Sequence, residues 1–286
     1  MKYQYFPGCS LKGMGRAYEE SFLAVSRALG MEINELEDWN CCGATAYMSV
    51  DETKSYALAG RNLAIAERNA SDVIAPCSAC YLVLNKTIHG MSENPDLHGK
   101  VTRALKAGGL DYKGKAKVRH PLDVLMNDVG LEEIKKRVKA PLAGMKLAPY
   151  YGCQIVRPYA TFDDQRDPVF MDKLITASGA ESVDWPLKTR CCGGSLTGTV
   201  PEAGLRLAYI LLKEAKKRGA QAIVTPCPLC QFNLDGYQEQ IARKYERIDM
   251  PVLYFTQMLG LAMGLSASEL GIKRCIISAD RVLAGR

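Results

Sequence analysis

The sequence predicts an α/β protein made of two tandem, pseudo-symmetric domains, each a small, mostly parallel sheet flanked by helices. Two observations support this fold class. One five-cysteine pattern occurs twice, and in each copy short apolar runs alternate with segments of helical periodicity. In both copies the first cysteine and the last two follow the apolar runs, and the loop with the adjacent cysteine pair can fold over the same edge. Because parallel strands end at one sheet edge, we expect the cysteine loops to meet at the strand carboxyl ends.

The repeat includes ten of the eleven cysteines. A single cysteine is followed by a Cys-Cys-Gly motif, and 34 residues separate the cysteine pair from a Cys-x-x-Cys motif in both copies. A period of about 150 residues is too long for a solenoid unit and suits two domains. We therefore predict domains at residues 1–143 and 144–286, with the boundary in the stretch 139–144.

The first half contains strand and helix signals in alternation. A short aromatic run at 3–7 reads as a buried strand that ends at Gly8-Cys9. Helical spacing follows and stops at Gly30. An Ala- and Leu-rich helix then precedes a strand that enters Pro76-Cys77, and the cysteine loop opens a further helix. The predicted first-half elements are helices over 18–29 and 55–69, and strands over 3–7, 73–75 and 118–122, the last followed by a helix.

The second half repeats this order. Its predicted elements are strands over 146–151, 222–224 and 251–254, and helices over 169–178, ending at Gly179, and 203–218. The apolar stretch 252–265 is shorter than a membrane span requires and contains Gln257. We read it as part of the packed core and expect no direct membrane insertion.

Composition excludes several classes of protein. The chain is 48% apolar and 24% charged, which is typical of a soluble globular protein. Its net charge of +6 is modest and its basic residues are dispersed, so nucleic-acid binding is not supported. The N-terminus lacks a secretory signal, which predicts a cytoplasmic protein. Because cytosolic thiols are kept reduced, so many cysteines favour metal or redox chemistry over disulfides.

Five cysteines per half exceed the needs of the common metal sites. Structural zinc takes four ligands, and an ordinary cubane iron–sulfur cluster also takes four, usually from a compact run that is absent here. Four of the five could still bind zinc with one spectator. The fifth thiolate points to a larger or opened cluster, or to a cysteine that bridges two irons. Glycines beside the cysteines would let the backbone approach such a group; they are Gly8, Gly43, Gly152, Gly193 and Gly194.

The doubled motif, with Cys41-Cys42-Gly43 and Cys191-Cys192-Gly193 each between an upstream cysteine and Cys-x-x-Cys, resembles the B subunit of heterodisulfide reductase and its bacterial relatives. The resemblance covers essentially the whole chain. It implies two noncubane [4Fe-4S] clusters as cofactors, with no catalytic residues beyond the cluster ligands. The implied ligands are Cys9, Cys41, Cys42, Cys77 and Cys80 for one cluster, and Cys153, Cys191, Cys192, Cys227 and Cys230 for the other.

The resemblance also implies an activity and partners. Two clusters that each move single electrons could reduce a small-molecule disulfide, such as the coenzyme M–coenzyme B heterodisulfide or a related sulfur compound. The chain has neither a dinucleotide-binding fingerprint nor a ferredoxin-type cysteine run, so its electrons must come from elsewhere. The family implies a C subunit with cubane [4Fe-4S] clusters as immediate donor, which a flavin-containing A subunit supplies in turn.

Alternative functions remain open at this point. The chain could be an electron-transfer subunit of a quinone-linked or other oxidoreductase complex that cleaves no disulfide, or a subunit of a sulfur-oxidising complex. It could also hold one cluster plus Zn, or serve as a zinc-stabilised assembly module. The substrate and the physiological direction are not selected by any residue between the ligands.

A few residues outside the cysteine sets are candidates for binding substrate. Basic residues near the cysteine loops could hold an anionic substrate, although solvated surface charge is the simpler reading for each; they are Lys12, Arg16, Arg157 and Arg190. Arg157 and Arg190 are the best of these because each lies a few residues from a ligand cysteine. His120 follows a predicted strand and could line the pocket. Cys275 reads as a buried or incidental thiol, because both sets are complete without it.

Overall fold

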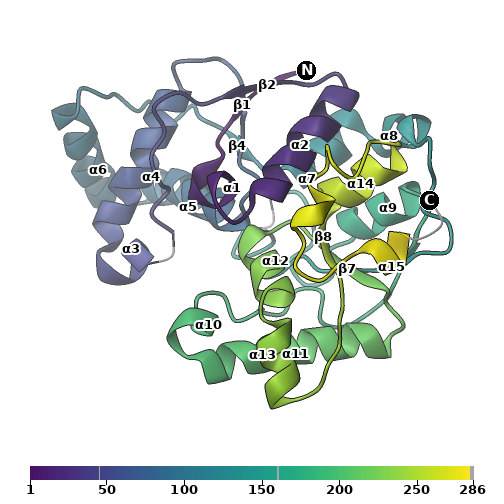
Figure 1. Cartoon of the computed structure of the whole chain (residues 1–286). Helices are drawn as coiled ribbons and strands as arrows, with labels where there is room; N and C mark the ends of the chain where they lie inside the picture. Colours follow the sequence, from purple (N-terminus) through teal and green to yellow (C-terminus); the bar gives the residue numbers. More distant parts are fainter. Residues whose placement is uncertain (45, 160, 284–286) are drawn as a thin grey trace.

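The computed structural model describes residues 1–44, 46–159 and 161–283. It contains two four-stranded sheets with equivalent strand orders, β2-β1-β3-β4 and β6-β5-β7-β8, and every strand pairing is parallel (Figure 1). The α/β prediction with tandem parallel sheets is therefore confirmed. The strands are β1 (Lys2–Tyr5), β2 (Glu32–Glu35), β3 (Val73–Ile74), β4 (Val118–Arg119), β5 (Lys146–Pro149), β6 (Glu181–Ser182), β7 (Ala222–Thr225) and β8 (Val252–Tyr254).

Helices flank both sheets. In the first half they are α1 (Gly8–Lys12), α2 (Arg16–Ala28), α3 (Ala46–Val50), α4 (Glu52–Ala66), α5 (Ser78–Glu93), α6 (Pro95–Ala107), α7 (Pro121–Val124), the π-helix η1 (Leu125–Val129) and α8 (Leu131–Arg137). In the second half they are α9 (Phe170–Ala177), α10 (Leu196–Thr199), α11 (Pro201–Lys217), α12 (Pro228–Asp235), α13 (Gln238–Lys244), α14 (Phe255–Ala262), the 3₁₀ turn η2 (Ile272–Arg274) and α15 (Asp280–Leu283).

The predicted strands lie in the sheets as expected, but each sheet has one more. The central strands β1, β3, β5 and β7 are built mainly from buried residues, which gives the apolar runs visible in the sequence. The additional strands β2 and β6 are edge strands. Their residues are mostly exposed and polar, so they lack the apolar signal that sequence analysis depends on.

Local sequence explains where the main helices begin and end. The Asp51 side chain caps α4 by accepting the backbone N–H of Lys54, and the Asn94 side chain caps α6, whose first residue is a proline. Helix α2 buries Tyr18 and Phe22 on one face and is followed by Gly30, whose φ of +69° only glycine adopts readily. These signals place most helix ends within three residues of the predictions.

The two halves exchange helix contacts and share a core. Helix α14 of the second half packs on α2 of the first, and α7 and α8 of the first half pack on α9 of the second; Figure 1 shows α14 beside α2. At the centre Tyr18 stacks on Tyr254 with ring centroids 4.5 Å apart, and the buried hydroxyls of Ser21 and Thr256 are 2.6 Å apart. One hydrophobic cluster runs from Tyr3 to Met263 through both halves. The halves thus share a core, and the second half has a further hydrophobic cluster of its own, from Ala148 to Val252.

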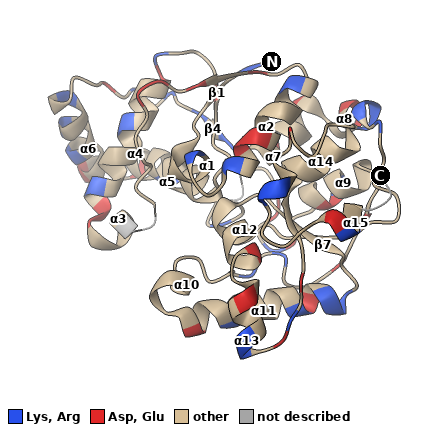
Figure 2. Ribbon diagram, in the orientation of Figure 1, with Lys and Arg blue, Asp and Glu red and all other residues tan. Residues whose placement is uncertain are grey.

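The surface shows charges of both signs. Figure 2 shows lysines and arginines dispersed over many elements and interleaved with acidic residues. In the described part of the chain, no helix is long and apolar enough to cross a membrane.

Candidate metal centre

The fold brings the first five cysteines together at the carboxyl ends of β1 and β3. Cys9 lies in α1 directly after β1, and Cys77 is the N-cap of α5 directly after β3. The Sγ atoms of Cys42 and Cys80 are 3.2 Å apart, and those of Cys9 and Cys41 are 4.0 Å apart. Cys9 and Cys41 are exposed, whereas the other three are buried. The set therefore has a solvent-facing side and a protein-facing side.

The second set repeats this arrangement around a cavity. Cys153, Cys191, Cys192, Cys227 and Cys230 all line one cavity of about 190 Å³, together with Ser78 from the first half. The Sγ atoms of Cys192 and Cys230 are 3.5 Å apart. A single water molecule needs only about 10–15 Å³, so this space suits a group of several atoms. Among the described residues, no group of three or more His, Cys, Asp or Glu side chains is arranged to hold a single metal ion.

Sulfur–sulfur hydrogen bonds within each set favour the thiolate form of one partner and the protonated form of the other. They raise the pKa values of Cys41, Cys80, Cys153 and Cys230. A hydrogen bond with Cys41 is the main cause that lowers the pKa of Cys42, to about 4. In the second half a hydrogen bond with Cys230 lowers the pKa of Cys192 to about 7. A hydrogen bond with Cys153 and, to a smaller extent, the charge of Arg157 lower the pKa of Cys191 to about 6. Lowered thiol pKa values are typical of metal-binding and redox cysteines.

Glycines keep the cysteine loops tight. Gly8 and Gly152 have φ values of +62° and +70°, and a Cβ on either would stand 2.8 or 3.0 Å from the Sγ of Cys80 or Cys230. At Gly43 and Gly193 a Cβ would instead meet Ser55 of α4 and Gly204 of α11. Gly8 and Gly152 thus lie close to a cysteine sulfur, whereas Gly43 and Gly193 approach helices behind the loops, and a Cβ at Gly194 would meet no atom within 4 Å.

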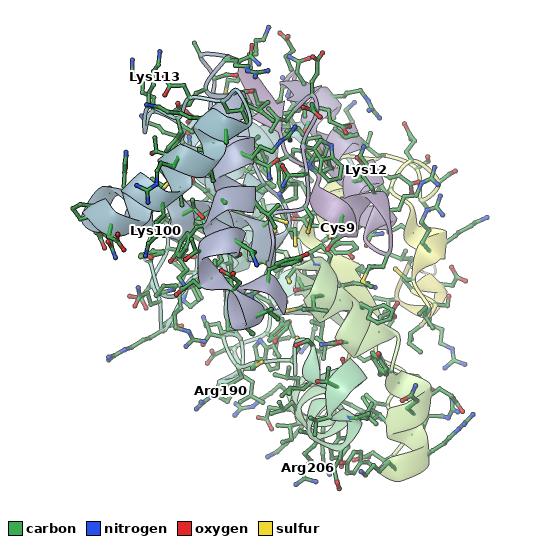
Figure 3. All side chains as sticks on the ribbon, turned by 90° about the vertical axis from the view of Figure 1, so that its left-hand side faces the viewer. Cys9, Lys12, Lys100, Lys113, Arg190 and Arg206 are labelled. Carbon is green, nitrogen blue, oxygen red and sulfur yellow. The ribbon has the colours of Figure 1, made fainter. Side chains whose placement is uncertain are left out.

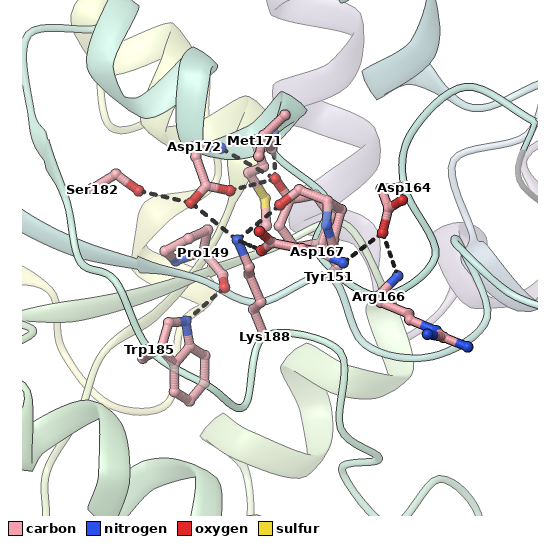
Figure 4. Close-up of polar contacts among 12 residues, drawn as sticks. Pro149, Tyr151, Asp164, Arg166, Asp167, Met171, Asp172, Ser182, Trp185 and Lys188 are labelled. Atoms are coloured by element: carbon pink, nitrogen blue, oxygen red, sulfur yellow. Dashed lines mark hydrogen bonds and ion pairs between the residues drawn. The ribbon is translucent and has the colours of Figure 1, made fainter.

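A polar network holds the loops of Cys153 and Cys191 together (Figure 4). The hydroxyl of Tyr151 donates to Asp172 at 2.5 Å and accepts the backbone N–H of Met171 at 2.8 Å. Lys188 Nζ lies 2.6 Å from Asp167 and 3.7 Å from Asp172. The Lys188 carbonyl accepts the backbone N–H groups of Tyr151 and Gly152. The segment before Cys191 is thus tied to the residues before Cys153.

His120 lies between the two Cys-x-x-Cys loops. It is fully buried, and Leu122 N–H donates to its Nδ1, which leaves Nε2–H to donate to the carbonyl of Pro76 at 3.0 Å. Burial lowers the pKa of His120 to about 4, although hydrogen bonds to the carbonyls of Pro76 and Pro226 oppose the shift. Each of these prolines precedes a cysteine of the sets. The ring is therefore neutral, and it lies outside the lining of the second cavity.

The four basic candidates differ in their contacts. Lys12 lies beside Cys9 on α1 (Figure 3), but it forms salt bridges with Glu19 and Glu35 at 2.6 and 2.7 Å. Arg16 forms an ion pair with Glu20 at 3.3 Å. Arg157 donates to the Thr189 carbonyl at 2.6 Å, next to the Cys191 loop.

Arg190 lies at the periphery of the molecule in Figure 3, and its backbone carbonyl accepts the Tyr150 hydroxyl at 2.7 Å. Arg157 is the candidate whose positive charge helps to lower the pKa of a cysteine, Cys191.

One contact of the second cysteine set was not predicted from the sequence. Asn233 in α12 is fully buried, and its Nδ2 lies 3.3 Å from the Sγ of Cys192 and 2.9 Å from the carbonyl of Gly194. The corresponding first-half position, three residues after the Cys-x-x-Cys motif, is Val83. A comparison of the two copies at equal spacing could have found this difference.

Comparisons with known proteins identify the family. The model of the CCG cysteine-rich domain matches twice, over residues 3–85 and 147–235. The chain belongs to this family. Each match begins before the first cysteine of a set and extends past its Cys-x-x-Cys motif, so the family assignment covers both sets.

Similar proteins span the whole chain. A protein of Archaeoglobus profundus that is named as like the B subunit of heterodisulfide reductase is 35% identical, with 99% of this chain and 97% of the relative covered. The B subunit of a ferredoxin/F420H2-dependent CoB–CoM heterodisulfide reductase of Methanosarcina acetivorans is 32% identical, covering 99% and 96%. The 8-methylmenaquinol:fumarate reductase membrane anchor subunit of Wolinella succinogenes is 34% identical, covering 98% and 99%. The predicted resemblance to the B subunit of heterodisulfide reductase is thus confirmed.

A solved structure shares the fold. A hypothetical protein from Helicobacter pylori superposes with a TM-score of 0.77 at 14% identity over 97% of this chain. The chain spans about half, 52%, of that protein. The family and the similar proteins together support a role as an oxidoreductase subunit.

Proposed function

We propose that this chain is the catalytic iron–sulfur subunit of a heterodisulfide reductase-type complex, and that each cysteine set binds one noncubane [4Fe-4S] cluster. The observation that carries the proposal is that the fold gathers a complete five-cysteine set at the carboxyl edge of each sheet. The proposed ligands are Cys9, Cys41, Cys42, Cys77 and Cys80 for the first cluster, and Cys153, Cys191, Cys192, Cys227 and Cys230 for the second.

The residues present fit such a group. The second set surrounds a cavity large enough for several atoms, and its donors are sulfur atoms, which iron–sulfur clusters require. Cys77 and Cys227 are the N-caps of α5 and α12, so the positive ends of two helices face the anionic ligands. Gly8 and Gly152 leave no Cβ against the sulfurs of Cys80 and Cys230.

The proposed reaction is reduction of a small-molecule disulfide. Cleavage of its S–S bond consumes two electrons and two protons and yields two thiols. Bound iron–sulfur clusters supply electrons one at a time, which is why two centres in one chain suit a two-electron reaction. The exposed side of each set, at Cys9, Cys41 and Cys191, is where electrons or substrate can reach the centres.

The finer assignments belong to the same proposal. Arg157, beside the Cys191 loop, and Arg190 are proposed to bind an anionic group of the substrate. His120, which the sequence also proposes for substrate binding, would act from the interior by holding the two Pro-Cys turns. The domains are proposed at 1–143 and 144–286, although 284–286 lie outside the described residues. Proposed partners are a C subunit with cubane clusters and a flavin-containing A subunit, in the cytoplasm.

The test is anaerobic purification followed by metal analysis and electron paramagnetic resonance. We expect about eight irons per chain, four for each cluster, and disulfide cleavage by the dye-reduced protein with a panel of small disulfides. The variant Cys192→Ser should lose one cluster, whereas Cys275→Ser should keep both. Zinc as the bound metal in either half, or iron that does not depend on Cys192, would contradict the proposal.

A second candidate function is supported by the fumarate reductase relative, which is as similar as the heterodisulfide reductase subunits. In this alternative the chain passes electrons between a quinol and another subunit without cleaving a disulfide. Quinol oxidation by a complex containing this chain, together with no cleavage of any disulfide in the panel, would favour it.

A further inference from the structure

The two cysteine sets have equivalent contacts with the backbone. In both halves the backbone N–H groups that follow the cysteine pair reach its sulfurs: Gly43 and Ala44 contact Cys41 and Cys42, and Gly193 and Gly194 contact Cys191 and Cys192. Both sets also lie at helix N-termini. These shared contacts give the two centres no reason to differ in reduction potential.

A buried side chain breaks this symmetry. Asn233 is 0% exposed and its Nδ2 reaches the Sγ of Cys192 at 3.3 Å. The orientation of the amide is settled by the Gly194 carbonyl at 2.9 Å, because a carbonyl can only accept and so requires Nδ2 on that side. The hydroxyl of Thr197 supports the amide from its other end, 2.8 Å from Oδ1. The second N–H of Nδ2 is therefore directed at the sulfur.

The described part of the first half shows no equivalent side-chain donor. Val83 occupies the equivalent position, and in the described part of the first half only thiols and backbone N–H groups act as hydrogen-bond donors to Cys42. Ser10 lies near another sulfur, that of Cys77, but the distance of 3.9 Å is too long for a strong hydrogen bond.

The charges near the two cysteine sets also differ, and the difference favours a higher reduction potential for the second centre, as the Asn233 hydrogen bond does. Arg157 lies four residues after Cys153, and its charge acts on Cys191. The equivalent first-half residue, four after Cys9, is the uncharged Gly13. The nearby Lys12 is held by two carboxylates, those of Glu19 and Glu35.

These contacts predict different potentials because reduction adds negative charge to a cluster. Hydrogen bonds to ligating sulfurs and nearby positive charge stabilise the reduced form and raise its potential. Solvent exposure has the opposite effect, because it would raise the potential of the first centre more than that of the second: Cys9 is exposed, whereas Cys153 is half-buried. A fixed donor in a buried, low-dielectric site interacts more strongly than mobile water.

We infer that the second centre, beside Asn233 and Arg157, has the higher reduction potential, so electrons that enter the chain come to rest there. The inference rests on the proposed two-cluster function. Asn233 acts on the cluster through Cys192 and is a positioning residue rather than a catalytic one.

The experiment is a redox titration of the anaerobic holoprotein followed by electron paramagnetic resonance. The variant Asn233→Val, which copies Val83, should lower the potential of one centre only. We expect about a tenfold change in its reduced-to-oxidised ratio at fixed potential, which is about 59 mV for a one-electron couple. Arg157→Gln should lower the same centre, and because Arg157 is exposed this variant keeps the test available if Asn233→Val does not fold.

Two variants serve as controls. Thr197→Val removes the support at Oδ1 but leaves the donor to sulfur and its Gly194 contact, so both potentials should stay unchanged. Val83→Asn offers a donor near Cys42 and should narrow the difference between the centres. Equal potentials in the wild-type protein, or a shift of both centres in Asn233→Val, would overturn this inference alone. Only about four irons per chain would overturn the two-cluster proposal with it.

Discussion

The substitution Gly152→Ala tests whether the tight turn before Cys153 exists to accommodate a cysteine sulfur. Gly152 has a φ of +70°, and a Cβ there would lie 3.0 Å from the Sγ of Cys230. The left-handed backbone alone costs an alanine about 1–2 kcal/mol. Forcing an extra carbon against a packed atom adds about 1–3 kcal/mol. We therefore expect Gly152→Ala to lower the free energy of unfolding by about 2–5 kcal/mol.

Gly219→Ala is the matched control. Gly219 follows α11 with a φ of +81°, and a Cβ there would meet no atom within 4 Å. It should cost only the backbone contribution of about 1–2 kcal/mol. The difference between the two variants measures the contact with sulfur.

The assay combines denaturant unfolding with iron analysis, both under anaerobic conditions. Because Cys230 must move, Gly152→Ala should also lose iron toward half the wild-type content, whereas Gly219→Ala should keep all of it. Gly8→Ala, with a Cβ 2.8 Å from Cys80 Sγ, should reproduce the effect in the first half. Equal stability and equal iron in Gly152→Ala and Gly219→Ala would refute the reasoning.

Three further predictions concern single side chains. The folded-state pKa of His120, about 4, lies below the unfolded value near ~6.5, so the unfolded state binds the proton first and stability is lost as pH falls. Unfolding free energy should drop by about 2 kcal/mol from pH 7 to pH 5, and His120→Gln should remove this dependence; an unchanged slope would contradict it. Lys188→Met should destabilise by about 1–3 kcal/mol by stranding the partly buried Asp172, and adding Asp172→Asn should recover part of the loss in a double-mutant cycle; strictly additive effects would contradict the pairing. Burial and the nearby Asp235 raise the pKa of Cys275 to about 12, so it is a protonated thiol at neutral pH. Cys275→Ala should leave iron content and spectra unchanged, and loss of iron would make it a ligand.

Much of the site could be predicted because its signals are local. Each cysteine directly follows a strand-like run or belongs to a short motif, so the parallel-sheet rule alone places the loops at one edge. The edge strand β2 could not be predicted in this way, because its residues Glu32–Glu35 are polar and mostly exposed. Its place in the sheet depends on backbone pairing with β1, and every residue type except proline can form both kinds of those hydrogen bonds.

The contacts that could not be predicted join distant segments. The position of His120 depends on how the two halves meet, since its ring contacts the Pro76 carbonyl of its own half and the Pro226 carbonyl of the other. Asp172 and Lys188 come from α9 and from the loop before Cys191, and Tyr151 contacts both segments, through its hydroxyl to Asp172 and its backbone N–H to the Lys188 carbonyl. Asn233 is one of several buried polar residues of α12, beside Gln231 and Asp235, and its partner is chosen by packing rather than by spacing.

Duplication within one core has a consequence that two separate domains would not share. The helices α2 and α14 pack across the halves, and Tyr18 stacks on Tyr254 between them, so the distance between the two cysteine sets is set by the interior. Ser78, beside Cys77, lines the second cavity and lies 3.4 Å from the Pro226 carbonyl, so the two Cys-x-x-Cys loops are in direct contact. Interiors pack closely and transmit strain, so a change in one loop is felt by the other. Val83 and Asn233 stand at the same position after the Cys-x-x-Cys motif in the two copies, and both are buried, yet they differ in polarity. The shared core thus fixes the geometry, while the side chain at this one buried position differs between the copies and would set the two potentials apart.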